Sequence, residues 1–200
     1  MMLPTHLVVG LAVAAPLLAV DPSLAPAALA GAAVGSVFPD LDLYSGHRRT
    51  LHFPTGYTLL AVPLVLAALS TPVPWLVGTA FAALGAALHS RMDRYGGGLE
   101  LEPWQGTSQR AVYDHVRGEW RAPKRWIRYD GSPRDALLAS GLGLPVLLVL
   151  DGPFAVLVAG AIAIGTIYAA LRRDLAALAP RVFALAPAPI EPYVPARYRP

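Results

Sequence analysis

Long stretches without a charged residue are the feature that most limits what this chain can fold into. The 200 residues contain five such runs, at 7–20, 22–39, 53–88, 136–150 and 152–171. The runs are rich in alanine and leucine, and they lack the alternation of apolar and polar residues that marks a half-buried strand. We therefore expect an all-α fold built from apolar helices.

Turn signals divide these runs into six helices. Residues 21–23, 70–74 and 151–153 have the composition of tight turns, and they pair successive helices as three helical hairpins. The expected helices cover about 3–20, 23–38, 54–70, 73–92, 135–150 and 153–172. A polar loop over 93–134 and a proline-rich tail over 179–200 complete a single domain.

The helices are too apolar for an ordinary soluble domain. Hydrophobic side chains make up 55% of the chain and charged ones only 14%, whereas soluble domains are near one quarter charged. Too little polar surface exists to coat six such helices, which predicts a polytopic helical bundle in a membrane. A span needs about 20 apolar residues. The runs at 24–38 and 136–150 are shorter, so a soluble bundle with a very apolar core is the alternative.

The basic residues predict how this bundle lies in the cell membrane. All 16 lysines and arginines fall on the face that carries the N-terminus, the 39–53 and 91–134 loops and the tail, and the three tight turns have none. The positive-inside rule places this face, with both termini, in the cytoplasm. The first residues lack the basic start of a signal peptide, so we expect them to remain as the first helix.

The composition of the polar loop indicates contact with the bilayer surface rather than with nucleic acid. It contains Trp104, Trp120 and Trp126, and tryptophan is enriched where a membrane meets water. Over residues 91–134 the acidic residues nearly balance nine basic ones, so no nucleic-acid partner is expected. The lipid bilayer and a small amphiphilic substrate are the expected partners, and the oligomeric state is left open.

Histidines and aspartates gather at the cytoplasmic ends of the predicted helices. Four of the five histidines and three aspartates lie in four short stretches far apart in the sequence. The members of this set are His6, Asp40, Asp42, His47, His52, His89 and Asp93, with Arg48 beside His47. The predicted topology brings all of them to one membrane depth. Each alone could simply finish a helix, but together they have the donor types of a divalent metal site.

We expect this set to bind a divalent metal, with zinc favoured and manganese or iron as alternatives. His6, Asp40, His52 and His89 are the expected ligands. Asp93 is four residues after His89 on one helix face, and it either joins the ligands or orients His89. Seven candidates exceed one tetrahedral shell, so two metals and one metal with supporting residues both remain open. The chain has no cysteine, which excludes thiolate ligands.

The remaining polar residues have expected roles in catalysis. His47 or Asp42 is expected to act as general base, and Arg48 to hold an anionic phosphate oxygen. His115 lies in the polar loop and is expected to be solvated. A serine nucleophile is poorly supported, because the chain has no G-x-S-x-G sequence.

These stretches, in this order, resemble the YdjM-like family of membrane-bound metal-dependent hydrolases. The matching pieces are Thr5-His6 with Gly10, Pro39-Asp40-Leu41-Asp42, His47-Arg48 with His52, and His89 with Asp93 followed by Glu102-Pro103-Trp104. The family pattern is His-Arg-x-x-Thr-His-Ser. Here Thr50 comes one place early and Phe53 replaces the serine, while the spacing of the two histidines is kept. The resemblance covers about residues 1–105 and implies a metal site similar in ligand style to zinc phospholipase C-like enzymes.

Three functions are compatible with these features. The leading hypothesis is a membrane-bound hydrolase of a phosphoester or lipid-like substrate, with its site at the cytoplasmic face. A transporter is an alternative, because Pro16, Pro63 and Pro145 could break helices, although the apolar runs carry no charge at the bilayer midplane. A non-catalytic membrane scaffold, whose histidines and aspartates merely finish the helices, is the other alternative.

Overall fold

The computed structural model describes residues 1–43, 45–187, 189–194 and 198, and this part of the chain is mostly helical. The helices are α1 (Leu3–Ala14), α2 (Leu17–Val20), α3 (Ala25–Val37), α4 (Pro54–Ser70), α5 (Pro74–Met92), α6 (Pro133–Leu147) and α7 (Gly152–Phe183). Short 3₁₀ turns are η1 (Phe38–Asp42), η2 (Asp93–Tyr95), η3 (Pro103–Gln105) and η4 (Glu191–Tyr193). The expected all-α character is thus confirmed, apart from one small hairpin of strands.

Proline marks where the helices begin. Each of the six helices longer than ten residues has a proline at its first or second position. Proline suits these positions, because its missing N–H would have no partner there and its fixed φ already matches a helix. At the start of α6, the Ser132 side chain also accepts a hydrogen bond from the amide of Asp135. The many prolines therefore divide the apolar sequence into separate helices.

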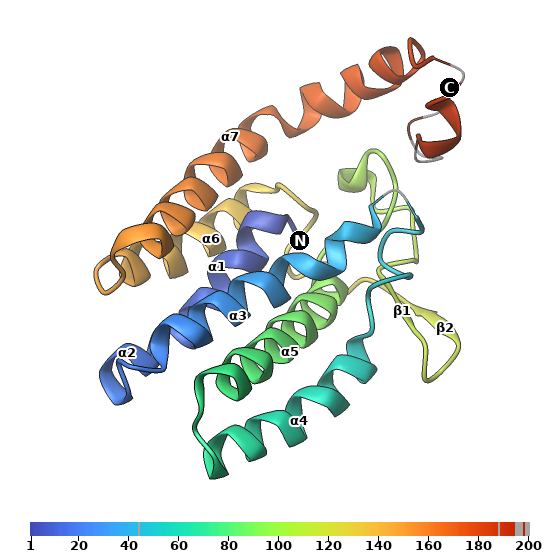
Figure 1. Ribbon diagram of the computed structural model, residues 1–200. Helices are drawn as coiled ribbons and strands as arrows, with labels where there is room; N and C mark the ends of the chain where they lie inside the picture. The colour runs from blue at the N-terminus through green and yellow to red at the C-terminus, as the bar shows by residue number, and fades with distance from the viewer. Residues whose placement is uncertain (44, 188, 195–197, 199–200) are drawn as a thin grey trace.

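The helices lie side by side, with the polar segments gathered at one end (Figure 1). α1 packs on α3, α4 on α5 and α6 on α7, so the three predicted hairpins are present. α3 also packs along α5, and α1 packs on α6 and α7, which joins the hairpins into one bundle. The core lies where α1, α3 and α7 meet, around Val8, Leu11, Leu29 and Val158.

Glycine lets α3 approach its neighbours closely. A Cβ atom added at Gly31 would overlap the backbone carbonyl of Gly78 on α5, and one added at Gly35 would overlap that of Ala82. These two glycines form the small-xxx-small spacing that suits close helix packing. The two helices are therefore in backbone contact along α3.

A second close approach lies at the polar end of α3, around Ser36. A Cβ atom at Gly10 of α1 would overlap the Ser36 hydroxyl, and one at Gly85 of α5 would lie 2.9 Å from the carbonyl oxygen of Ala32. His6 is one helical turn before Gly10, and His89 is one turn after Gly85. The contacts that fix the spacing of α1, α3 and α5 therefore lie next to the histidines.

Three predicted boundaries differ in the structure. The first helix is interrupted at Pro16, which separates α1 from α2. α6 ends at Leu147 rather than at 150. α7 continues to Phe183, beyond its expected end at 172 and into the expected tail. The charged residues at 172–174 end the apolar run without ending the helix, because the alanines and leucines that follow are strong helix formers.

The polar loop is folded rather than merely extended. Strands β1 (Val112–Asp114) and β2 (Glu119–Arg121) pair antiparallel, with Val112 opposite Arg121. The loop is attached to α7 by Arg172, whose Nε donates to the carbonyl of Asp130 at 3.2 Å and lies 3.3 Å from its carboxylate. Buried Arg172 also lies over the ring of Trp104. These contacts place the loop over the end of the bundle.

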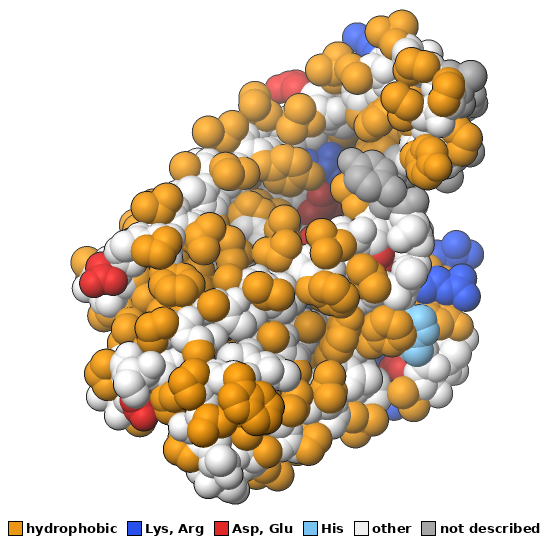
Figure 2. Space-filling view, in the orientation of Figure 1, with side chains coloured by type: hydrophobic (Ala, Val, Ile, Leu, Met, Phe, Trp, Pro, Cys, Tyr) orange, Lys and Arg blue, Asp and Glu red, His pale blue; other side chains and the backbone are white. Residues whose placement is uncertain are grey.

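Two helical segments are long and apolar enough to cross a membrane. They are Leu3–Val20, which contains α1 and α2, and Gly152–Phe183, which is α7; α4 is a shorter apolar helix. Only 17% of the apolar window of α7 is buried, which is unlike the core helix of a soluble protein. Large apolar side chains are also exposed along α4, such as Leu59 and Leu66. Figure 2 shows hydrophobic side chains over most of the helices in this view, with lysine and arginine gathered at the loop end.

The contact between α3 and α5 gives a direct test of the fold. We expect Gly35→Ala to destabilise the protein by about 1–3 kcal/mol, because the added methyl group would overlap a backbone carbonyl. Gly160→Ala is the matched control, since a Cβ at this helical position meets open space. Thermal unfolding of the detergent-purified proteins, followed by circular dichroism, measures the difference. Equal melting temperatures for the two variants would contradict the close packing.

Candidate metal centre

Four separate segments bring the predicted site residues together at the polar end of the bundle. α1 contributes His6, and η1 contributes Asp40 and Asp42. The segment between η1 and α4 contributes His47, Arg48 and His52, and the end of α5 with η2 contributes His89 and Asp93. All eight residues that the sequence singled out thus belong to one cluster, although they span 87 positions from His6 to Asp93.

Pro39 sets the local geometry of the two aspartates. A proline has no N–H to continue the hydrogen bonds of an α-helix, so α3 ends at Val37 and the chain continues as the 3₁₀ turn η1. Asp40 and Asp42 therefore lie on different sides of a tight turn. They contact opposite nitrogens of the His52 ring: Asp40 lies 3.5 Å from Nε2, and Asp42 lies 2.9 Å from Nδ1.

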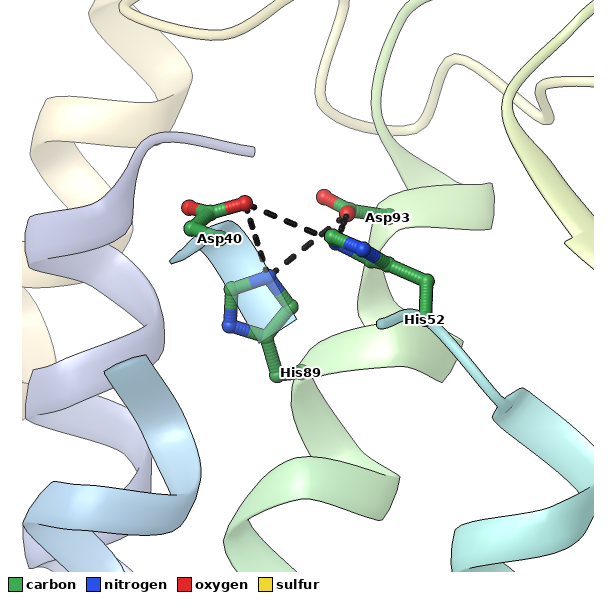
Figure 3. A group of neighbouring side chains, drawn as sticks. All are labelled: Asp40, His52, His89 and Asp93. Carbon is green, nitrogen blue, oxygen red and sulfur yellow. Dashed lines mark ion pairs between the residues drawn. The ribbon is translucent and has the colours of Figure 1, made fainter. Parts of the chain in front are cut away.

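Asp40, His52, His89 and Asp93 point their ligand atoms toward one centre (Figure 3). The Nε2 atom of His52 lies 3.2 Å from Oδ2 of Asp93, and the Nε2 atom of His89 lies 3.3 Å from Oδ1 of Asp40. The remaining His–Asp separations are 3.5 and 3.7 Å. A tetrahedron with zinc–ligand bonds of about 2.0–2.1 Å has edges of about 3.3–3.4 Å. The four His–Asp separations are therefore close to the edges of a tetrahedral metal site, and all four ligand atoms lie within 4.8 Å of one another.

Hydrogen bonds on the outer side of each ring fix the histidines for metal binding. Nδ1 of His89 lies 2.6 Å from the backbone carbonyl of Ser36, and a carbonyl only accepts, so this nitrogen carries the proton. Nδ1 of His52 faces the Asp42 carboxylate in the same way. A neutral imidazole protonated at Nδ1 has its lone pair on Nε2, which is the atom that faces the centre in both residues. This arrangement is the usual support of metal-binding histidines.

The converging atoms lack hydrogen-bond partners. Nε2 of His52, Nε2 of His89 and Oδ2 of Asp93 are all buried, and none of them has a hydrogen bond. A buried polar atom without a partner costs about 1–3 kcal/mol, and more where the group is charged. Because these three atoms face one another, a single cation at the centre would satisfy all of them. The residues therefore fit a divalent metal.

The centre has a strongly negative field. Burial by itself raises the pKa of Asp40, but the close approach of His52 and His89 outweighs it and holds the pKa well below its ordinary value. Burial also raises the pKa of Asp93, but the charges of Arg48, the N-terminal amino group and His6 together outweigh it and lower the pKa. For His52, burial opposes the charged form, yet the carboxylates of Asp40, Asp42 and Asp93 around the ring raise the pKa to about 10. The carboxylates thus stabilise a positive charge at this position.

Asp42 links the centre to His47. Its carboxylate contacts the rings of both His47 and His52 and accepts the backbone amides of Arg48 and Leu51, so its two oxygens are fully used. His47 lies 3.1 Å from Asp42 and 3.8 Å from Asp40, with 19% of its side chain exposed. Burial lowers the pKa of His47, and the Asp42 hydrogen bond only partly opposes this. Asp42 therefore acts by positioning the two histidines, and His47 lies at the rim.

Arg48 is turned into the protein instead of toward solvent. Its Nε lies 3.5 Å from Oδ2 of Asp93, and its Nη1 donates to the carbonyl of Gly97 at 2.9 Å. The residue is 4% exposed and has a φ of 61°, a conformation that costs about 1–3 kcal/mol outside glycine. The carbonyl of Arg48 accepts the amide of Tyr113, which ties this backbone to β1. Arg48 therefore neutralises and positions Asp93.

Three histidines lie outside the group of four ligand atoms, namely His47 at the rim, His6 and His115. His6 was expected among the ligands, but its Nε2 lies 3.1 Å from Oδ1 of Asp93, the oxygen that faces away from the centre. Its ring stacks on that of His89 with the centroids 3.7 Å apart. His115 is exposed as expected, and its Nε2 contacts the carbonyl of Arg49 at 2.7 Å. His6 thus supports two ligands from behind, and His115 is separate from the centre.

The carbonyl of Ser36 is the functional group that the sequence did not indicate. It is a backbone atom, so no residue type marks it, and only its place one turn before Asp40 connects it with the site. Gly85 contributes in a similar way, because its missing side chain allows α5 to approach Ser36. The one sequence signal for these positions is small residues, such as Gly85 and Ser36, one turn away from the predicted ligands His89 and Asp40.

No protein-family model, curated protein or solved structure matches this chain.

Removing single ligands tests the metal centre directly. We expect the detergent-purified wild type to contain about one equivalent of a divalent metal, and His52→Ala and His89→Ala to lose it, because each variant removes one of four converging atoms. Metal analysis by mass spectrometry gives the content of each protein. His115→Ala is the matched control and keeps the metal, since this histidine is outside the group. Equal metal content in all three variants, or none in the wild type after zinc is added, would contradict the assignment.

Proposed function

We propose that this chain is a membrane-bound metal-dependent hydrolase that acts on a phosphoester of a lipid or amphiphile at the cytoplasmic face. The observation that carries the proposal is the group of four His and Asp ligand atoms, three of them buried without a hydrogen bond. The resemblance of residues 1–105 to the YdjM-like hydrolases points to the same activity. Zinc is the proposed metal, and the mixed imidazole and carboxylate donors also suit manganese or iron.

Asp40 and His47 mark where a substrate would enter. Their side chains are 20% and 19% exposed, whereas those of His52, His89 and Asp93 are at most 1% exposed. A substrate therefore approaches from the side of η1 and the segment after it. A catalytic metal needs an open position, which a fifth ligand site or displacement of the partly exposed Asp40 would supply.

The residues around the centre have distinct roles in the proposed reaction. When bound, a divalent metal supplies a Lewis acid that polarises the phosphoryl group and acidifies a water molecule. His47 accepts the proton from the water, and we assign it this role over Asp42, whose oxygens are already used. The oxygen of water joins the phosphorus and the phosphorus–oxygen ester bond breaks. The leaving alcohol takes the proton that His47 accepted, which returns His47 to its neutral form. Arg48, held against Asp93, balances the charge of the site.

The exposed surface supports placement in a membrane. Apolar side chains are exposed on α4, α6 and α7, and soluble monomers rarely expose contiguous apolar patches of this kind. α3 has 13 residues, or about 20 Å, which is shorter than the roughly 30 Å of a bilayer core. It is enclosed by α1 and α5, however, and need not span alone. We propose that the three hairpins form a multi-pass bundle with both termini in the cytoplasm.

Because the chain has no cysteine, the proposed topology can be tested by labelling single introduced cysteines, with no reaction at native thiols of this protein. Thr71→Cys introduces a thiol in the turn between α4 and α5, and Arg128→Cys introduces one in the polar loop. Both positions are exposed. With a membrane-impermeant maleimide on intact cells, we expect labelling at 71, and labelling at 128 only after permeabilisation. Labelling of both positions in intact cells would contradict the proposed orientation.

Turnover of phosphoesters tests the proposed activity. We expect the purified protein to hydrolyse a phosphomonoester or phosphodiester in a screen of short-chain phospholipids and nitrophenyl phosphates. Chelation should abolish the activity and added zinc restore it. His47→Ala should lower kcat by roughly 100-fold or more through loss of the proton acceptor. It should keep the metal, because His47 is not among the four ligand residues.

His115→Ala is the control for this screen and is expected to retain full activity. Undiminished turnover in His89→Ala or in the chelated protein would disprove the metal-dependent mechanism. Metal that is bound without any hydrolysis would favour the non-catalytic scaffold.

A further inference from the structure

We infer that a pocket beside the metal centre, lined by Arg91, Arg94, Arg117 and Arg121, binds the phosphate group of an anionic ligand. The pocket has a volume of about 180 Å³. A water molecule occupies about 30 Å³ in the liquid, so the space accommodates a phosphate group with part of its substituent. This site is distinct from the metal centre and does not depend on the proposed hydrolase activity.

The pocket forms where segments distant in the sequence meet. Arg91 and Arg94 come from the end of α5 and from η2, and Arg117 and Arg121 come from the β1–β2 hairpin. Thr55, at the start of α4, completes the wall and bonds to Asp114 of β1 at 3.3 Å. The arginines are thus held on folded elements and do not lie on a free tail.

Positive charge dominates this pocket. Four arginines and one aspartate, Asp114, line it. The Asp114 carboxylate already accepts the backbone amides of Val116 and Arg117 and the Thr55 hydroxyl, so it mainly stabilises the hairpin turn. Arginines placed together repel one another, and an anion between them removes this repulsion.

Two of the arginines are available for an anion. Arg121 pairs with Glu119 at 2.9 Å, and Arg117 lies 3.9 Å from Asp114. Within the described part of the chain, Arg91 and Arg94 have no such ion pair. Arg91 donates only to the hydroxyl of Thr58 at 3.0 Å, and the Nε of Arg94 is buried without a hydrogen-bond partner. An arginine donor that is buried and unpaired is suited to a phosphate oxygen, which guanidinium groups bind in bidentate fashion.

The pocket is next to the metal centre but opens on another side of α5. Arg91 is two residues after His89, and residues two apart on a helix point about 160° away from each other. Tyr95 lines the pocket and packs against exposed Trp126, with Lys124 over both rings. Aromatic and basic side chains of this kind are common at the level of lipid headgroups. A phosphomonoester headgroup and a soluble phosphate ester share the chemistry that this pocket recognises.

Calorimetric titration of the full-length protein in detergent tests the pocket, with dihexanoyl phosphatidic acid, dihexanoyl phosphatidylcholine and inorganic phosphate as probes. We expect saturable binding of phosphatidic acid and at least about tenfold weaker binding of phosphatidylcholine, whose phosphate carries less charge. Arg94→Gln and Arg91→Gln should each weaken binding by roughly tenfold, the size of one charge-assisted hydrogen bond. Exposed Arg91 can be replaced even if Arg94→Gln fails to fold. Arg128→Gln, an exposed arginine of the same loop, is the control and should bind normally.

The probes also distinguish the source of the phosphate. Inorganic phosphate that binds with the same arginine dependence indicates a soluble phosphate ester, and binding of phosphatidic acid alone indicates a lipid headgroup. Binding should persist in His89→Ala, because the metal centre is separate. The proposal fails if neither phosphatidic acid nor inorganic phosphate binds saturably. It also fails if Arg128→Gln binds as weakly as the pocket variants. It also fails if His89→Ala abolishes binding while Arg91→Gln leaves it unchanged.

Discussion

The close approach of α1 and α5 to α3 is the constraint on which the rest of the structure depends. Gly10 and Gly85 bring these helices against Ser36, where any larger residue would meet the backbone or side chain of α3. His6 is one turn from Gly10 and His89 is one turn from Gly85, so both histidines lie close to Ser36. The carbonyl of Ser36 then orients His89. Helix packing and the geometry of the centre are therefore set by the same contacts.

The cluster of charges is costly in a bundle this apolar, and its internal arrangement compensates for much of the cost. Asp40, Asp42 and Asp93 are largely removed from water, and buried carboxylates are tolerated only when they are paired and hydrogen-bonded. Asp42 meets this condition through two rings and two amides. Oδ1 of Asp93 meets it through His6 and the N-terminal amino group. Oδ2, which faces the other ligands, has no hydrogen bond and is balanced by the charge of Arg48.

Much of the helical framework and the membership of the cluster could be predicted from the sequence, because both depend on local patterns. Charge-free runs bounded by turns indicate helices. Histidines and aspartates at the same ends of these helices are expected to lie at one depth in the membrane. The sequence does not predict which atom of each histidine or aspartate faces the metal centre. Whether His6 binds a metal or supports Asp93 depends on which carboxylate oxygen it meets, and this follows from the packing of α1. Nor does the pattern show that α7 continues past Arg172, because the signal for the end of a span is not a signal for the end of a helix.

The length of α7 affects how far the polar loop stands above the bilayer. The helix runs for 32 residues, or about 48 Å, which exceeds a bilayer core of roughly 30 Å. In the proposed placement its last turns therefore project into the cytoplasm. Arg172 joins this helix to the polar loop near Asp130, just where the apolar run stops. In the proposed placement, α7 thus holds the polar loop at a fixed height above the bilayer, at the level where a lipid substrate would present its headgroup.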